Sequence, residues 1–432
     1  MKSRFLWMIL LLSAATVFAQ ETLTVEQAIE IALKNNYDIQ LSQNRATIAA
    51  LNNSPGNAGM LPRINGVVSD NATLNNLNQK YSSGLEVNTN NATGNNLAAS
   101  VNLNWTLFDG LRMFATKGRL KRLEEIGELN YKDTLQNVVA QTIVAYYDVV
   151  SAQQQINAIN EIIKIAEERV KIADLSFNIG SSSKVDLLQA KVDLNAGRSA
   201  LLNQRKLIEQ KKAELNRILA RPAETDFNTQ DTIPVNYEPK LSDPAELDTK
   251  NFQLQAALKN LDVAKYSKKE AFSYFLPNLT GNAAYGFTRT NSSSGFALYN
   301  QQYGLSGGFT LSLPLFNGLV NWNNYKVAGV QVQSSQFTLE RARLQVKVNY
   351  YKAIREFLNA KEILKLEEDN IGLAKENASI ALERFRLAQS TALELREAER
   401  SYTEALTRLV NARFNAKTAE TELMRLQGEL VK

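Results

Sequence analysis

The sequence predicts an α+β membrane protein, in which long antiparallel coiled-coil helices join four short strands of a transmembrane β-barrel that several chains share. Three observations lead to this prediction. The chain repeats itself once, at an offset near 208 residues. Long stretches without helix breakers carry an apolar residue at every third or fourth position. Four shorter stretches alternate apolar side chains with Asn, Thr or Ser, which is typical of strands between lipid and water.

The composition excludes most catalytic chemistry. The 432 residues include no cysteine and no histidine, which rules out disulfides, Cys/His zinc sites and Ser-His-Asp or Cys-His catalysis. The phosphate-binding pattern GxxxxGK[ST] and the metalloprotease pattern HExxH are absent. We therefore expect no enzyme, no cofactor and no metal site. The net charge of +5 is too small to indicate a nucleic-acid partner.

Residues 1–19 have the features of a secretory signal peptide. Lys2 and Arg4 supply the positive amino end, and an apolar stretch follows from Phe5 to Phe18. Val17 and Ala19 place small residues at positions −3 and −1 of a cleavage site after Ala19. The apolar stretch is short for a membrane-spanning anchor, so we expect this segment to be removed.

The internal twofold repeat divides the rest of the chain into residues 20–220 and residues 244–432. Its clearest marker is Trp105-Thr106-Leu107-Phe108-Asp109-Gly110, which aligns with Leu313-Pro314-Leu315-Phe316-Asn317-Gly318. Between the halves lies a predicted linker, residues 221–243, in the most proline-rich part of the chain.

Each half is predicted to have the same order of elements. A first helix is followed by two strands and then by a long helical hairpin, whose first helix would be on the order of 100 Å long. The polar, almost uncharged stretches 73–96 and 290–303 are predicted to be long loops between the strands. The predicted helix, strands and hairpin are 24–53, about 62–71, about 97–108 and 111–220 in the first half, and 244–271, about 277–289, about 304–316 and 319–428 in the second.

The returning helix of each hairpin carries a seven-residue apolar repeat, which predicts coiled-coil packing against its neighbours. In the first half the same register contains two polar exceptions, Gln204 and Lys211. In the second half the register is unbroken through Leu395, Ala398, Tyr402, Ala405, Leu409, Ala412, Ala416, Ala419, Leu423 and Leu426.

The predicted strands have one apolar face and one polar face. Val101, Leu103 and Trp105 alternate with Asn102 and Asn104, which fits either a lipid-facing strand or a soluble sheet with one wet face. Four strands cannot close a barrel, because about eight are needed and lipid does not tolerate an open edge. Several chains would have to contribute. Two copies would give eight strands and three would give twelve, and the strand pattern favours neither number.

The chain resembles the TolC family of outer-membrane efflux proteins. The resemblance rests on the opening Leu23-Thr24-Val25-Glu26-Gln27-Ala28-Ile29, the Phe-Asp/Asn-Gly corners, the turn from Phe177 to Ala190, the signal peptide and the repeat. It implies a homotrimer in outer-membrane lipid, with a shared twelve-stranded barrel above a periplasmic α-barrel. Such a trimer is a passive exit duct for efflux or secretion, and it works with an inner-membrane transporter and a periplasmic adaptor.

The resemblance also implies roles for residues at the breaks 178–184 and 387–392, the predicted periplasmic tips. Asp186, Glu394 and Glu397 would line the narrow entrance, the two glutamates as stacked rings of three that favour cations. A simpler alternative is that the glutamates are solvated charges paired with Arg396, Arg400 or Lys184. The residues expected to contact the adaptor are Gly180, Ser183, Ala388, Ser390 and Thr391.

The tips depart from the family pattern. Ser390 is neutral where some members have a basic residue that locks the closed tip, and Phe385 stands at a tyrosine position. Ala388 aligns with Gly180, so the second turn need not be built like the first. The alternative function is a periplasmic coiled-coil adaptor or scaffold without a pore, which would leave the lipid-compatible strands without a role.

Overall fold

The structure is a computed structural model that describes residues 22–238, 241–387 and 389–431. The predicted signal peptide, residues 1–19, lies outside the described residues. The chain forms two compact units, and each takes segments from both halves of the sequence. We call Met1–Gln40, Thr134–Pro244 and Val348–Lys432 the tip unit, and Leu41–Asp133 with Ala245–Lys347 the sheet unit.

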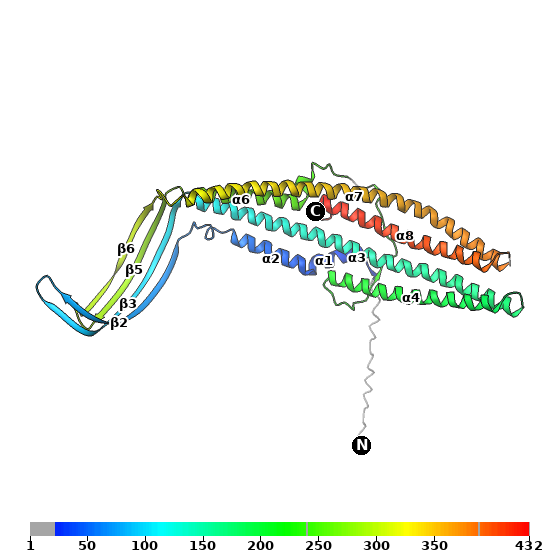
Figure 1. The fold of residues 1–432 in the computed structure, drawn as a ribbon, viewed down its shortest axis with the longest axis horizontal. Coiled ribbons are helices and arrows are strands. Elements are labelled where there is room, and N and C mark those ends of the chain that lie inside the picture. The colour runs from blue at the N-terminus through cyan, green and yellow to red at the C-terminus, as the bar shows by residue number, and fades with distance from the viewer. Residues whose placement is uncertain (1–21, 239–240, 388, 432) are drawn as a thin grey trace, which may run out of the picture. The chain divides into compact units, whose positions relative to one another are not determined.

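The tip unit is built mainly from two helical hairpins (Figure 1). The two long outgoing helices, each an unbroken 67 residues, begin in the sheet unit and end in the tip unit. In the predicted linker, β4 (Asn228–Thr229) forms a short parallel pair with β1 (Thr22–Leu23). The helices are α1 (Val25–Asn35), α3 (Arg112–Asn178), α4 (Lys184–Ile218), α7 (Val320–Arg386) and α8 (Ala392–Gln427).

Ion pairs join the two helices of each hairpin, and those between α3 and α4 show that these helices run antiparallel. Between α3 and α4, Glu167 pairs with Arg198 and Asp148 pairs with Lys211, so numbers rise on one helix as they fall on the other. Between α7 and α8, Arg408 lies 3.0 Å from Glu367.

The predicted apolar register of the returning helices is the buried face of the tip unit. All ten register residues of α8, from Leu395 to Leu426, are buried. On α4 the polar exception Gln204 is also buried, and its Nε2 donates a hydrogen bond to the Ala152 carbonyl at 3.0 Å, which offsets the cost of burying the amide. Lys211 is satisfied by its ion pair with Asp148. The two polar residues of this register are therefore each bonded to a group on α3, the Ala152 carbonyl or the Asp148 carboxylate.

The sheet unit contains a four-stranded antiparallel sheet in the order β2-β3-β5-β6 (Figure 1). Arg119 and Glu270, 2.8 Å apart, and Lys259 and Glu125, also 2.8 Å apart, hold α6 antiparallel to the start of α3. The elements are α2 (Tyr37–Asn52), β2 (Arg63–Lys80), β3 (Glu86–Asp109), α5 (Leu247–Lys250), α6 (Phe252–Ser273), β5 (Asn278–Ser292) and β6 (Tyr299–Ser312).

The strands are longer than predicted, and the predicted long loops are wrong. Most of 73–96 is strand, because β2 and β3 continue their ladder out to Lys80 and Glu86 and leave only a short turn. Residues 290–303 are likewise mostly strand. The polar Asn and Thr side chains of these segments hid the ladder, since strand pairing depends on backbone groups. In the other direction, β6 ends at Ser312 rather than 316, ahead of Pro314, which has no N–H to donate.

The register puts most of the large apolar side chains of the four strands on one face. Residues paired across strands lie on the same face, and Gly66, Val101, Tyr285 and Leu305 form one such row. The apolar face is exposed in the single chain, with Leu305 at 79%. The rows Ile64-Leu103-Ala283-Gly307 and Val68-Ala99-Phe287-Tyr303 share this face, and the rows Asn65-Asn102-Ala284-Ser306 and Arg63-Asn104-Asn282-Gly308 lie on the other.

Each predicted first helix is broken by an asparagine. Asn36 separates α1 from α2, and its Oδ1 accepts from the amides two and three residues further on, at 2.9 and 3.2 Å. Asn251 separates α5 from α6 and accepts in the same way, at 3.1 and 3.2 Å. The uninterrupted helices predicted over 24–53 and 244–271 are therefore wrong, because an asparagine side chain caps a new helix start within each.

Other local features also occur in both halves. Gly110 and Leu111 both have positive φ ahead of α3, and Gly318 and Leu319 do the same ahead of α7. Tyr146 donates to the Leu23 carbonyl, and Tyr350 donates to the Ser242 carbonyl, each at 2.8 Å. None of the helices in the described part of the chain combines the length and apolar character needed to cross a membrane.

Candidate site at the helix tips

The first tip turn is a compact helix ending followed by a capping box. The Ser181 amide bonds back to the Ser176 carbonyl at 2.8 Å, and Gly180 has a φ of 76°, which glycine adopts without strain. Ser183 then caps α4, because its Oγ accepts from the Asp186 amide at 3.2 Å. The Asp186 carboxylate accepts from the Ser183 hydroxyl at 2.8 Å and from its amide at 3.2 Å. Asp186 therefore stabilises the start of α4.

The second turn has matching bonds on both sides of Ala388, which itself lies outside the described residues. The Gln389 amide bonds to the Arg384 carbonyl at 2.8 Å, as Ser181 does with Ser176 in the first turn. Thr391 caps α8 by accepting from the Glu394 amide at 3.2 Å. The described parts of both turns thus combine a tight helix ending with a hydroxyl cap.

Glu394 has local partners that differ from those of Asp186. Its side chain is longer by one methylene, and its Oε2 accepts from the Ser390 hydroxyl at 2.5 Å. Arg384 lies 3.9 Å from the same oxygen. The Ser390 hydrogen bond and the Arg384 charge lower the pKa of Glu394 below its usual value of 4.5, so the group stays ionised at neutral pH.

Glu397 is a more weakly held charge. Its carboxylate is 4.0 Å from Arg400, and both side chains are about two-thirds exposed. Of the predicted alternatives, Arg400 is therefore a partner of Glu397. Arg396 instead lies 3.5 Å from Asp193, on the other hairpin. Among the described residues, no ion pair or hydrogen bond joins Asp186, Glu394 or Glu397 to the opposite hairpin.

A buried charge cluster next to the tips was missed by the sequence reasoning. Arg169 on α3 is 4% exposed and donates to Asp193 on α4 at 2.7 Å and to Glu399 on α8 at 2.8 Å. This arginine joins both hairpins of one chain. Burial raises the pKa of Glu399, and the nearby Arg169 charge opposes that shift. No sequence pattern marks the cluster, because Arg169, Asp193 and Glu399 lie on three different helices and only packing brings them together.

A second contact between the hairpins lies further from the tips. The Tyr402 hydroxyl, on α8, donates to Glu161, on α3, at 2.7 Å. Burial and the neighbouring carboxylate raise the pKa of Tyr402 to about 12, so the phenol remains a donor at physiological pH. The α3–α8 contact is therefore polar at both Arg169 and Tyr402.

The tip turns also expose apolar side chains that the sequence reasoning did not select. Ile179 and Val185 flank the first turn and are 78% and 71% exposed. Leu387 and Leu393 flank the second at 64% and 70%. The hydroxyls of Ser183, Ser390 and Thr391 already make local bonds, and the exposed apolar side chains add contact surface to each turn.

Comparison with known proteins identifies the family. The sequence model of the family described as outer membrane efflux protein matches residues 28–221 and 244–429. The chain belongs to the outer membrane efflux protein family. Family membership places it in the outer membrane, with a large periplasmic part.

Relatives in this family are distant in sequence. Protein CyaE of Bordetella pertussis is 26% identical over 58% of this chain, and the match spans only 53% of its own length. The alkaline protease secretion protein AprF of Pseudomonas aeruginosa is 21% identical over 71% of this chain and 64% of its own length. The outer membrane protein TolC of Escherichia coli is 22% identical over 78% of this chain and 70% of its own length.

Solved structures of membrane channels share the fold. The outer-membrane channel OprN superposes with a TM-score of 0.79 at 18% identity, covering 94% of this chain and 89% of that one. CusC superposes with a TM-score of 0.80 at 17% identity, covering 94% and 92%. The helix-rich architecture with one four-stranded antiparallel sheet is therefore that of outer-membrane channels.

Proposed function

We propose that this chain forms the outer-membrane exit duct of an efflux or secretion system. It would act passively, without enzymatic activity. Cargo would be delivered by an inner-membrane transporter and would reach the duct through a periplasmic adaptor. The observation that carries the proposal is the sheet, which has a continuous apolar face across four strands and two edge strands, β2 and β6, that each pair on one side only among the described residues.

The sheet supports a barrel shared between chains. An exposed apolar face of this size fits lipid, and backbone groups on an open edge are costly in lipid. Each edge strand would therefore pair with a strand of another copy. The resemblance to the family supplies the number three, which gives a homotrimer with a twelve-stranded barrel.

The paired local features support the internal repeat. The Gly-Leu corners before α3 and α7, the asparagine caps at Asn36 and Asn251, and the two tyrosine bonds occupy corresponding places in the halves. In three copies, two similar hairpins per chain would supply the wall of a periplasmic α-barrel. The buried seven-residue register of α8 is the expected inner face of coiled-coil packing.

The tips would form the periplasmic entrance. Glu394 and Glu397 are exposed and one helical turn apart on α8, so three copies would bring six carboxylates together. Asp186 is the third candidate, although its capping role already explains its presence. The Arg169 cluster would hold the two hairpins of each chain together while the entrance is closed, in place of a basic residue at Ser390.

The adaptor would meet the turns that contain Gly180, Ser183, Ala388, Ser390 and Thr391. The exposed apolar neighbours Ile179 and Leu393 supply contact surface there. A scaffold without a pore is the less favoured function, because it gives no role to the apolar face of the sheet.

Conductance in a planar lipid bilayer tests the proposal. We expect the purified protein to form discrete, cation-preferring channels. E394A/E397A should lower that preference and weaken block by divalent cations added from the tip side. The control E362A/E376A removes two exposed glutamates of α7 and should leave both properties unchanged. Trimers that never conduct would overturn the duct. Equal behaviour of the two double variants would overturn only the role given to the tip glutamates.

A further inference from the structure

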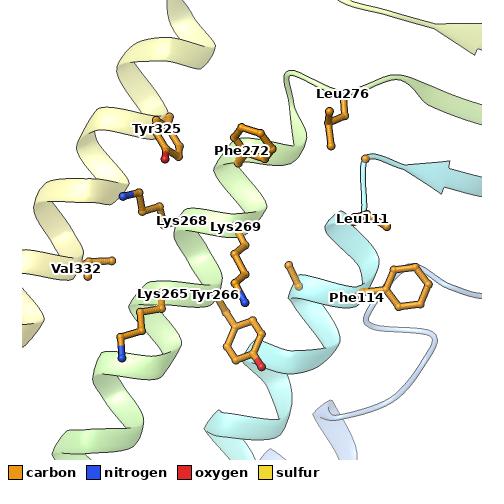
Figure 2. Close-up of a pocket in the computed structure, with 12 residues that line it drawn as sticks. Leu111, Phe114, Lys265, Tyr266, Lys268, Lys269, Phe272, Leu276, Tyr325 and Val332 are labelled. Atoms are coloured by element: carbon orange, nitrogen blue, oxygen red, sulfur yellow. The ribbon is translucent and has the colours of Figure 1, made fainter.

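A cavity of about 710 Å³ lies in the sheet unit where the strands meet the helices. Its lining includes Gly110 and Leu111, directly after β3, and Leu276, two residues before β5. Figure 2 shows α6 between α3 and α7, with side chains from all three helices around the cavity. The cavity therefore lies at the level where the chain leaves the sheet.

One part of the cavity is apolar and aromatic. Phe114 of α3 and Phe272 of α6 are both at least half exposed. The Phe272 ring lies 6.0 Å from the ring of Tyr325 on α7. Aromatic side chains with apolar neighbours are typical of the boundary between lipid and water. The lining residues Gly110 and Leu111 directly follow β3, the strand that carries Trp105 of the exposed apolar face.

The other part carries three lysines on one side of α6. Lys268 Nζ lies 5.0 Å from the centre of the Tyr325 ring, and Lys269 Nζ lies 4.9 Å from that of Tyr266. Neither ammonium has a carboxylate within 4.0 Å among the residues that the structure describes. Lys265 has only Asp262, at 3.4 Å, and Glu270 is held by Arg119.

Among the described residues, Lys268 and Lys269 have no carboxylate counter-charge, whereas Lys265 has Asp262. Lys268 and Lys269 lie three and four residues after Lys265, and like charges at these spacings on a helix repel each other. The rings of Tyr325 and Tyr266 offset only part of that repulsion. A bound anion would neutralise the ammonium groups of Lys268 and Lys269. The apolar side of the same cavity would require that anion to carry a hydrocarbon portion.

We propose that this cavity binds an anionic phospholipid of the membrane leaflet nearest the periplasm. The phosphate is held by Lys268 and Lys269, with Lys265 at the rim. An acyl chain lies along Leu111, Phe114 and Phe272 toward the sheet. The site rests on the proposed function to the extent that the sheet lies in the membrane and the helices lie below it. Its effect is to fix the depth of the duct in the bilayer.

The probes are phosphatidylglycerol and phosphatidylcholine with identical acyl chains, added to the detergent-solubilised full-length protein. Native mass spectrometry counts the lipids bound to each assembly. We expect retention of phosphatidylglycerol over phosphatidylcholine, and a loss of roughly tenfold or more in phosphatidylglycerol affinity for K268Q/K269Q. The control K361Q/K365Q makes the same charge change on α7 and should bind like the wild type. F114A should weaken long-chain phosphatidylglycerol more than a short-chain form.

Three results would overturn the site. These are equal retention of the two lipids, equal loss in both lysine double variants, or displacement by inorganic phosphate with no dependence on chain length, which would indicate a phosphate site only. Conductance of the same preparation separates this proposal from the duct. Conducting protein without lipid preference rejects the lipid site alone. Lipid binding through Lys268 and Lys269 without conductance rejects the duct and retains the site.

Discussion

Arg169 is the residue on which the contact between the two hairpins of one chain most depends. Its guanidinium is buried between Asp193 and Glu399, and the side chains of Arg169 and Glu399 are 5% and 10% exposed. Removing one member of a buried ion pair leaves a charge without its partner and costs about 3–5 kcal/mol. Replacing both members with apolar residues costs much less, because no charge is then left buried.

We therefore expect R169M to lower the free energy of local opening of the tip unit by about 3–5 kcal/mol. The double variant R169M/E399L should recover most of that loss. Hydrogen–deuterium exchange of α4 and α8, measured by mass spectrometry in detergent, reports the opening directly. Wild-type protection in R169M would show that the cluster does not hold the hairpins together.

Glu394 gives a prediction about pH. Because its pKa is lowered, the ionised form is favoured in the folded protein. The resulting stabilisation is present above the usual pKa and is lost as the pH falls through the lowered value. S390A removes the main hydrogen bond behind the shift, so the pKa should rise. We expect the cation preference of S390A channels to disappear at a higher pH than that of wild-type channels. An unchanged midpoint would mean that Ser390 does not tune this carboxylate.

Single residues were predictable from the sequence where one local pattern decides their place. The register of α8 indicated which ten side chains are buried. Ser183 and Asp186, three residues apart, also form a capping pattern that the sequence displays, and it explains Asp186 without a pore. Glu399 could not be predicted to be buried, because its partners Arg169 and Asp193 lie on other helices and only packing brings the three together.

At the scale of elements, helices were predicted better than strands. The long helices follow from uninterrupted helix formers, and their ends agree with the structure to within a few residues. The outer parts of β2 and β3 contain many asparagines, and no apolar alternation marks them as strand. Their pairing is visible only in the ladder, which runs from Arg63 opposite Asn104 to Lys80 opposite Glu86.

The β2–β3 turn should therefore be the outermost point of a long hairpin. The natural absence of cysteine allows a clean labelling test. We expect S82C, in the turn, to react with a membrane-impermeant maleimide on intact cells. The matched variant I179C, at the exposed first tip turn, should react only after the outer membrane is permeabilised. The reverse pattern, or equal labelling in intact cells, would contradict the proposed orientation.

At the scale of the whole molecule, the compact units differ from the halves of the predicted repeat. Each unit combines segments from both halves, because α3 and α7 pass from one unit to the other. Sequence similarity between the halves could not show this, since it compares segments along the chain and says nothing about which of them pack together. The number of chains is also absent from one sequence, which specifies two sheet edges but not how many copies join them.

We propose that separate chains close one barrel by pairing the edge strands β2 and β6 of neighbouring copies. Native mass spectrometry of the detergent-extracted protein tests it most directly. We expect one discrete species with three times the mass of a chain that begins after Ala19, and no folded monomer at equilibrium. A stable monomer that still forms ion-conducting channels would contradict the claim, because four strands would then have closed a pore without partners.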